Sequence, residues 1–77
     1  LTPAAKMEEF MFLGLRLVRG VSEKDFYRKF GVKVMSVYGE VIRKNELEKL
    51  LIRKNGWLRL TELGMDLANR VMADFIL

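Results

Sequence analysis

The chain has 77 residues and a formal net charge of +4, with 51% hydrophobic and 31% charged residues. This balance is typical of one folded domain with a single modest core, and it excludes a disordered or fibrous protein. Cysteine and histidine are absent, which excludes disulfides, thiolate clusters, the usual zinc sites and histidine-based acid–base chemistry. No apolar run reaches the roughly 18 residues of a membrane span. Basic and acidic residues are interleaved, which favours a solvated surface over an anionic partner.

A first helix is predicted from Pro3 to about Arg19, with Thr2 as its cap and Gly20 as its end. It is apolar over nearly its whole circumference. One face carries Met7, Phe10, Met11, Gly14, Leu17 and Val18, and roughly the opposite face carries Phe12 and Leu13. A helix of this kind requires burial on both sides, and so small a chain has too little material to cover both. We therefore expect this helix to dock on a larger neighbour.

A short second helix is predicted between the Ser22 cap and Gly31, followed by a third helix that begins at a Ser36 cap. The apolar face of the third helix consists of Val37, Tyr38, Val41 and Ile42. Its end allows two interpretations. Either Asn45 starts a new short helix, or the helix ends near Lys49 and the following leucines begin a strand. The second is preferred, because a hairpin signal follows.

That signal is Lys54-Asn55-Gly56, which lies between the apolar segments 50–53 and 57–60. Asn-Gly between apolar segments is the strongest short-range indication of a β-hairpin. A last helix is predicted from a Thr61 cap to the C-terminus, with Gly64 and Ala68 allowing a close approach on its buried side. The predicted fold is mainly α, a single winged-helix-like domain over residues 1–77 in the order helix, helix, helix, β-hairpin, helix.

Several segments resemble a known family, and they occur in order over nearly the whole chain. They are Glu8–Leu17 with Gly20-Val21, Phe30-Gly31, Val37–Ile42, Leu60-Thr61-x-x-Gly64 and Asn69-Arg70-Val71. Together they resemble the C-terminal domain of the oxygen-independent coproporphyrinogen III oxidase family, including its heme-chaperone-like members. The block Glu8–Arg16 is the most distinctive segment. Asn45 and Lys49 depart from the pattern, since similar sequences more often carry a leucine and a glycine there.

The resemblance implies a cytoplasmic radical S-adenosylmethionine parent protein, with a 4Fe-4S cluster held by a cysteine triplet in an N-terminal barrel. The parent then either decarboxylates a porphyrinogen oxidatively or binds heme for transfer, and this domain does not separate the two outcomes. The chain itself is expected to be a C-terminal piece of that polypeptide, since Leu1-Thr2-Pro3 is neither an initiator start nor a signal peptide. It is expected to have no catalytic, cofactor-binding or metal-ligating residue of its own. Its expected role is to pack on the barrel and help shape the tetrapyrrole site.

The candidate interface residues are Glu9, Phe12, Leu13 and Arg16. Glu9 and Arg16 form a narrow polar strip on the first helix, about 10 Å apart along its axis. They are interpreted first as anchors at a helix–helix seam, and second as contacts to the barrel or to an anionic group such as a propionate. An exposed apolar patch is expected around Phe12, Leu13 and Leu15.

Two other classes of function remain as alternatives. In a DNA-binding winged helix, Arg53, Lys54, Trp57 and Arg59 would lie along phosphate. Three carboxylates on the third helix (Glu40, Glu46 and Glu48) disfavour this interpretation, and Trp57 is interpreted as a cover over the core. A dimerisation module that uses Phe12 and Leu13 is the second alternative.

Heme ligation by methionine or tyrosine is disfavoured. Met7 and Met11 lie on the inner face of the first helix, where methionines are usually core residues. Tyr38 is expected to be half-buried, with its hydroxyl at the surface.

Overall fold

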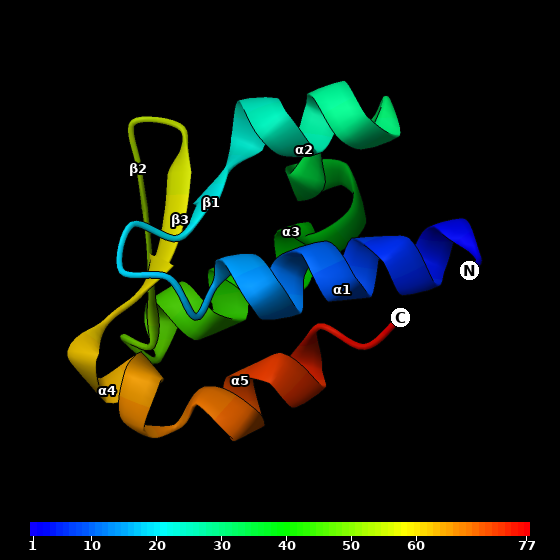
Figure 1. Ribbon diagram of the computed structural model, residues 1–77. Helices are drawn as coiled ribbons and strands as arrows, with labels where there is room; N and C mark the ends of the chain where they lie inside the picture. The colour runs from blue at the N-terminus through cyan, green and yellow to red at the C-terminus, as the bar shows by residue number, and fades with distance from the viewer.

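The computed structural model describes residues 1–77 and places five helices around a three-stranded antiparallel sheet (Figure 1). The elements are α1 (Pro3–Gly14), β1 (Val21–Ser22), α2 (Glu23–Phe30), α3 (Val34–Leu47), β2 (Leu51–Lys54), β3 (Trp57–Leu60), α4 (Glu62–Asp66) and α5 (Ala68–Asp74). The sheet lies at one end of the molecule, and α1, α2 and α5 extend from it toward the other end (Figure 1). The prediction of a mainly α domain with a hairpin is confirmed.

Helix α1 begins as predicted, because the Thr2 hydroxyl accepts a hydrogen bond from the Ala5 amide at 3.1 Å. The prediction that it runs to Arg19 is wrong, since it ends at Gly14 and tight turns follow up to Gly20. The cause is a contact between two segments that are distant in the sequence. Val21 pairs with Leu58 of β3, and a Cβ on Gly20 would overlap the Leu58 carbonyl oxygen. The chain must leave the helix early to make this close approach.

The pairing also adds a strand that the hairpin prediction did not include. Strand β1 has two residues, Val21 and Ser22, and the strand order in the sheet is β1-β3-β2. A two-residue strand is too short to produce the alternating pattern by which strands are recognised in a sequence. The predicted two-stranded wing is therefore a three-stranded sheet.

Helix α2 agrees with the prediction at both ends: the Ser22 hydroxyl accepts from the Asp25 amide at 3.2 Å, and Gly31 closes the helix with φ of 73°. The predicted Ser36 cap of α3 is wrong. This helix begins at Val34, with Lys33 at the cap position and no side-chain cap bond. Val34 is fully buried, so its place in the core outweighs the capping preference of a serine two residues later.

Helix α3 ends by a Schellman motif, in which the Leu50 amide donates to the Asn45 carbonyl at 2.9 Å and the Lys49 amide to the Glu46 carbonyl at 3.0 Å. Lys49 adopts the left-handed conformation, with φ of 61°. The preferred interpretation, one helix followed by a strand, is confirmed, and a new helix at Asn45 is wrong. A glycine at position 49 would adopt this left-handed backbone without the steric cost of a Cβ.

The hairpin turns at Asn55 and Gly56, both with positive φ, and pairs Lys54 with Trp57. In β3, Leu58 and Leu60 are buried while Arg59 is exposed, which is the alternation of a half-buried strand.

The last helix is divided, and the prediction of one helix to the C-terminus is wrong. The Thr61 cap is confirmed by a 3.0 Å bond from the Gly64 amide, but the helix stops at Asp66 and restarts at Ala68. A Cβ on Gly64 would overlap the Leu50 carbonyl oxygen, so α4 is fixed against the start of β2. The break at Leu67 lets α5 turn toward the core (Figure 1).

The core contains a chain of aromatic rings from α1, α2 and α3 and from Phe75, the residue that follows α5. The centre of the Phe10 ring lies 5.6 Å from the ring centres of Phe26 and Phe30. The centre of the Tyr38 ring lies 6.5 Å from that of Phe26 and 5.0 Å from that of Phe75. The expectation of a surface hydroxyl on Tyr38 is wrong, because this residue is 1% exposed and its hydroxyl has no hydrogen-bond partner. Burial raises the pKa of Tyr38 to about 12, and the charge of Glu8 adds to the effect.

Candidate docking surface

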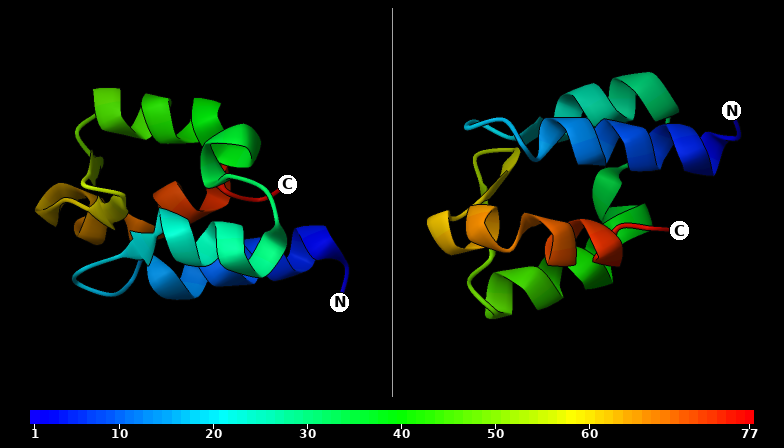
Figure 2. Two further views of the ribbon diagram at one scale, coloured as in Figure 1. Left: turned by 90° about the horizontal axis from the view of Figure 1, so that it is seen from above. Right: turned by 60° about the horizontal axis from the view of Figure 1, so that its bottom comes forward.

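A groove of about 480 Å³ runs between α1 and α2, which lie side by side in both views of Figure 2. We name it the α1–α2 groove. Its lining includes Glu9, Phe10, Leu13 and Gly14 of α1, Leu17 and Arg19 of the following turns, Asp25 and Lys29 of α2, and Trp57 of β3.

The last turn of α1 and the turns after it carry three exposed aliphatic residues, of which Leu13 and Leu17 line the groove and Val18 follows Leu17 in the chain. Leu13 is 64% exposed, Leu17 58% and Val18 87%; we name these three residues the apolar rim. Because exposed apolar side chains that lie together are a common feature of interaction sites, this edge is the candidate docking surface. Leu17 and Val18 were not among the predicted interface residues, because a helix continuing past Gly14 would have placed them on its inner face.

The structure brings together two of the four predicted interface residues. Glu9 and Leu13 line the groove. Phe12 is half-buried and packs against the core. Arg16 lies beyond the end of α1, so its predicted helical spacing from Glu9 does not apply, and its guanidinium donates to the Phe12 carbonyl at 3.5 Å.

The predicted apolar patch needs one correction. Leu15 is fully buried, because the chain leaves the helix at this residue and turns its side chain into the core. Leu13 is exposed as predicted, and the apolar rim continues along the turns rather than around the helix. Phe12 and Leu13 are therefore not both enclosed by this chain.

Charges in the groove are balanced, with the carboxylates of Glu9 and Asp25 and the cations of Arg19 and Lys29. The Arg19 guanidinium lies 4.8 Å from the centre of the Trp57 ring, a cation–π geometry. The interpretation of Trp57 as a cover over the core is wrong, because it lines the groove and is not among the residues packed on the core. Its alternation with the buried Leu58 could have indicated this outward position.

The basic residues considered for a phosphate contact are partly engaged within the chain. Arg53 binds Glu23 through two hydrogen bonds of 3.0 and 3.1 Å, and this hydrogen bond and the Glu23 charge raise the pKa of the Arg53 guanidinium. On α3, the Lys44 ammonium lies 3.2 Å from a carboxylate oxygen of Asp74. These ion pairs reduce the positive charge available to a nucleic acid.

The residues of the chain do not fit an iron–sulfur cluster, which requires thiolate ligands that a chain without cysteine cannot supply. No group of three or more acidic side chains is arranged to hold a metal ion. Met11, one of the residues considered for heme, is fully buried in the core.

None of the helices combines the length and the apolar character that a membrane crossing requires.

Comparisons with known proteins identify relatives along the whole chain. It is 36% identical over 77 residues to the heme chaperone HemW of Lactococcus lactis subsp. lactis strain IL1403, covering 100% of this chain and 20% of the relative. It is 33% identical over 75 residues to the heme chaperone HemW of Bacillus subtilis strain 168, covering 97% of this chain and 20% of the relative. The chain thus spans about a fifth of the length of these curated relatives. The search of solved structures gave no significant match.

The sequence profile of the HemN C-terminal domain matches residues 1–67. This match covers every element up to the break after α4, and it confirms the resemblance predicted from the ordered segments. The chain belongs to the HemN C-terminal domain family.

Proposed function

We propose that this chain is a non-catalytic accessory domain of a radical S-adenosylmethionine protein. It packs on the barrel of that protein through the α1–α2 groove and the apolar rim, and it helps to shape a tetrapyrrole site. Two findings support the proposal: the family of the domain, and relatives five times longer whose names describe heme chaperones. Because of those names, heme binding for transfer is favoured over porphyrinogen oxidation. The 4Fe-4S cluster and S-adenosylmethionine belong to the proposed barrel.

The apolar rim is the observation that carries the docking proposal. Full burial of a leucine or valine side chain stabilises by about 1.5–3 kcal/mol. Leu13, Leu17 and Val18 are each more than half exposed, so covering all three would contribute roughly 3–5 kcal/mol to docking. No other part of the surface has three large aliphatic residues so close in sequence and so exposed.

The test uses the full-length parent protein with the double substitution Leu13→Asp and Leu17→Asp. Leu47→Asp is the matched control, because Leu47 is 83% exposed and ends α3, which lies on the side opposite α1 in Figure 2. Two quantities are measured: the rate of limited proteolysis between barrel and domain, and the heme affinity from an absorbance titration.

The double variant should be cleaved faster and should bind heme at least about tenfold more weakly, while the control behaves as the wild type. Arg16 is the polar interface candidate that lies outside the groove. The substitution Arg16→Ala should therefore have a smaller effect in the same direction. Unchanged cleavage and unchanged heme affinity in the double variant would contradict the proposal. The parent is also expected to carry a Cys-x-x-x-Cys-x-x-Cys motif upstream, and its absence would favour the DNA-binding alternative.

The same rim would serve a dimerisation module. Sedimentation of the isolated chain distinguishes this role, since dimerisation through the rim makes the mass depend on concentration and Leu13→Asp abolishes that dependence.

A further inference from the structure

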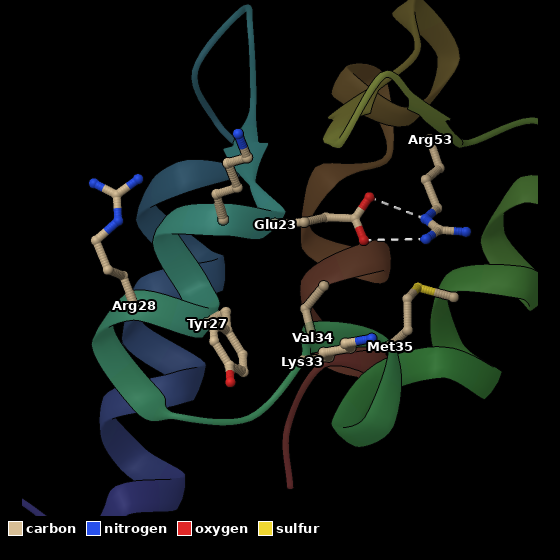
Figure 3. Close-up of a pocket in the computed structure, with 8 residues that line it drawn as sticks. Glu23, Tyr27, Arg28, Lys33, Val34, Met35 and Arg53 are labelled. Atoms are coloured by element: carbon tan, nitrogen blue, oxygen red, sulfur yellow. Dashed lines mark hydrogen bonds and ion pairs between the residues drawn. The ribbon is translucent and has the colours of Figure 1, made fainter.

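A second cavity lies on the other side of α2, between this helix, the start of α3 and strand β2. Its volume is about 600 Å³, which is within the range of roughly 300–1,000 Å³ found for small-molecule sites. It is lined by Glu23, Lys24, Tyr27, Arg28, Lys33, Val34, Met35 and Arg53, and shares no residue with the α1–α2 groove. Figure 3 shows the side chains that surround it.

The cavity has an apolar floor and two apolar walls. Val34 lies beneath the floor and is fully buried, so it supports the cavity from the core side. Tyr27 of α2 and Met35 of α3 stand on opposite sides of the space in Figure 3. Tyr27 is 55% exposed, which is a large exposure for an aromatic ring on so small a domain. A flat apolar group between Tyr27 and Met35 would contact both walls.

The polar groups around this floor are mostly cationic. Four lining residues are basic and one is acidic, and that acid, Glu23, is already bound by Arg53. Arg28 points away from the cavity in Figure 3 and pairs at 3.5 Å with the exposed Asp25. Lys24 and Lys33 have no ion-pair partner. Beyond the lining, Glu46 acts on Arg53 electrostatically, and the cavity retains an excess of positive charge.

Arg53 is held in a fixed orientation at the edge of this cavity. Glu23 occupies its Nε and Nη2 atoms, and a guanidinium has five N–H donors, so the donors on Nη1 remain available. The Glu23 carboxylate therefore already fills one edge of the planar fork, and a bound carboxylate or phosphate can reach only the outer donors of the Arg53 guanidinium.

We propose that this cavity binds a small organic anion, in which a one- or two-ring apolar body lies between Tyr27 and Met35 and a carboxylate or phosphate faces Lys33 and Arg53. The charge selects anions, and the apolar walls select against inorganic phosphate alone. The site is independent of the docking proposal, since it lies on the opposite side of α2.

The test is a titration of the ¹⁵N-labelled chain with 1-naphthoate, followed by amide chemical shifts, with the neutral 1-naphthalenemethanol as the matched ligand. The amides of residues 27 and 33–35 should shift with naphthoate, and the neutral analogue should bind more weakly. The double substitution Lys24→Gln and Lys33→Gln should lower the naphthoate affinity about fivefold. Lys54→Gln, at an exposed lysine of β2 that does not line the cavity, is the control and should have little effect.

Tyr27→Ala removes one wall without disturbing the core, and should weaken both ligands. Shifts centred elsewhere, equal affinity for the two ligands, or no effect of the lysine substitutions would overturn the proposal. Binding to the isolated chain but not to the full-length parent would also overturn it, because a segment of the parent would then fill the cavity.

Discussion

Replacing Lys49 by glycine should stabilise the domain. Lys49 occupies the position after α3 where the Schellman motif requires a left-handed backbone, with φ of 61°. This conformation costs a residue with a Cβ about 1–2 kcal/mol, and glycine adopts it without that cost. The Lys49 side chain is exposed and forms no ion pair, so its removal deletes no contact.

The expected gain follows from two opposing effects. Relief of the left-handed strain contributes about 1–2 kcal/mol, and the greater freedom of glycine in the unfolded chain removes about 0.4–1 kcal/mol. The net stabilisation is about 0.5–1 kcal/mol, or several degrees in Tm for a domain of this size. The backbone hydrogen bonds of the motif, including the 2.7 Å bond from the Thr61 hydroxyl to the Lys49 carbonyl, are retained.

Urea denaturation of the 77-residue chain measures this gain as a higher midpoint with an unchanged slope. Lys49→Ala keeps the Cβ and should change the midpoint little, which separates the backbone effect from the loss of charge. Lys54→Gly places a glycine in a regular strand and should destabilise by roughly 0.5–1 kcal/mol. If Lys49→Gly lowers the midpoint as Lys54→Gly does, the interpretation of the helix end is wrong.

Three further substitutions test the packing. Gly20→Ala should destabilise by about 3 kcal/mol or more, because its Cβ would overlap the Leu58 carbonyl oxygen. Gly31→Ala has a similar φ and no atom within 4 Å, so it should cost only about 1–2 kcal/mol, and equal losses in urea denaturation would refute the steric argument. Tyr38→Phe should raise the free energy of unfolding by about 1 kcal/mol, because it removes a buried hydroxyl without a partner. In the wild type, Tyr38 ionises near pH 10 when unfolded and at about 12 when folded, so stability falls between these values as the unfolded state loses its proton first. Tyr38→Phe should weaken this alkaline decline, and an identical decline in both proteins would contradict the assignment.

The features that the sequence predicted well depend on neighbours within a few residues. Thr2, Ser22 and Thr61 each cap a helix through a hydrogen bond to an amide three residues later. Gly31 and the Asn55-Gly56 turn depend only on the backbone conformations that those residues allow. Such local preferences can be read in one sequence without knowledge of the packing.

The predictions that failed depend on contacts between distant segments. The early end of α1 follows from the pairing of Val21 with Leu58, 37 positions away in the sequence. The close approach of Gly64 to Leu50, 14 positions away, fixes α4 against the start of β2, and the helix breaks at Leu67 soon after it. The candidate groove shows the same dependence on distant contacts. Glu9 and Leu13, which line it, were predicted from the helical pattern, whereas Leu17 was not, because its exposure depends on where the helix ends.

Trp57 is the only tryptophan of the chain, and it lies in the α1–α2 groove beneath the Arg19 guanidinium. The indole therefore acts as an intrinsic fluorophore at the surface proposed to meet the barrel, and its emission should move to shorter wavelength when that surface is covered. The cavity beyond α2 contains no indole. A ligand bound there should leave the emission spectrum unshifted, so a single optical signal distinguishes occupancy of the two surfaces.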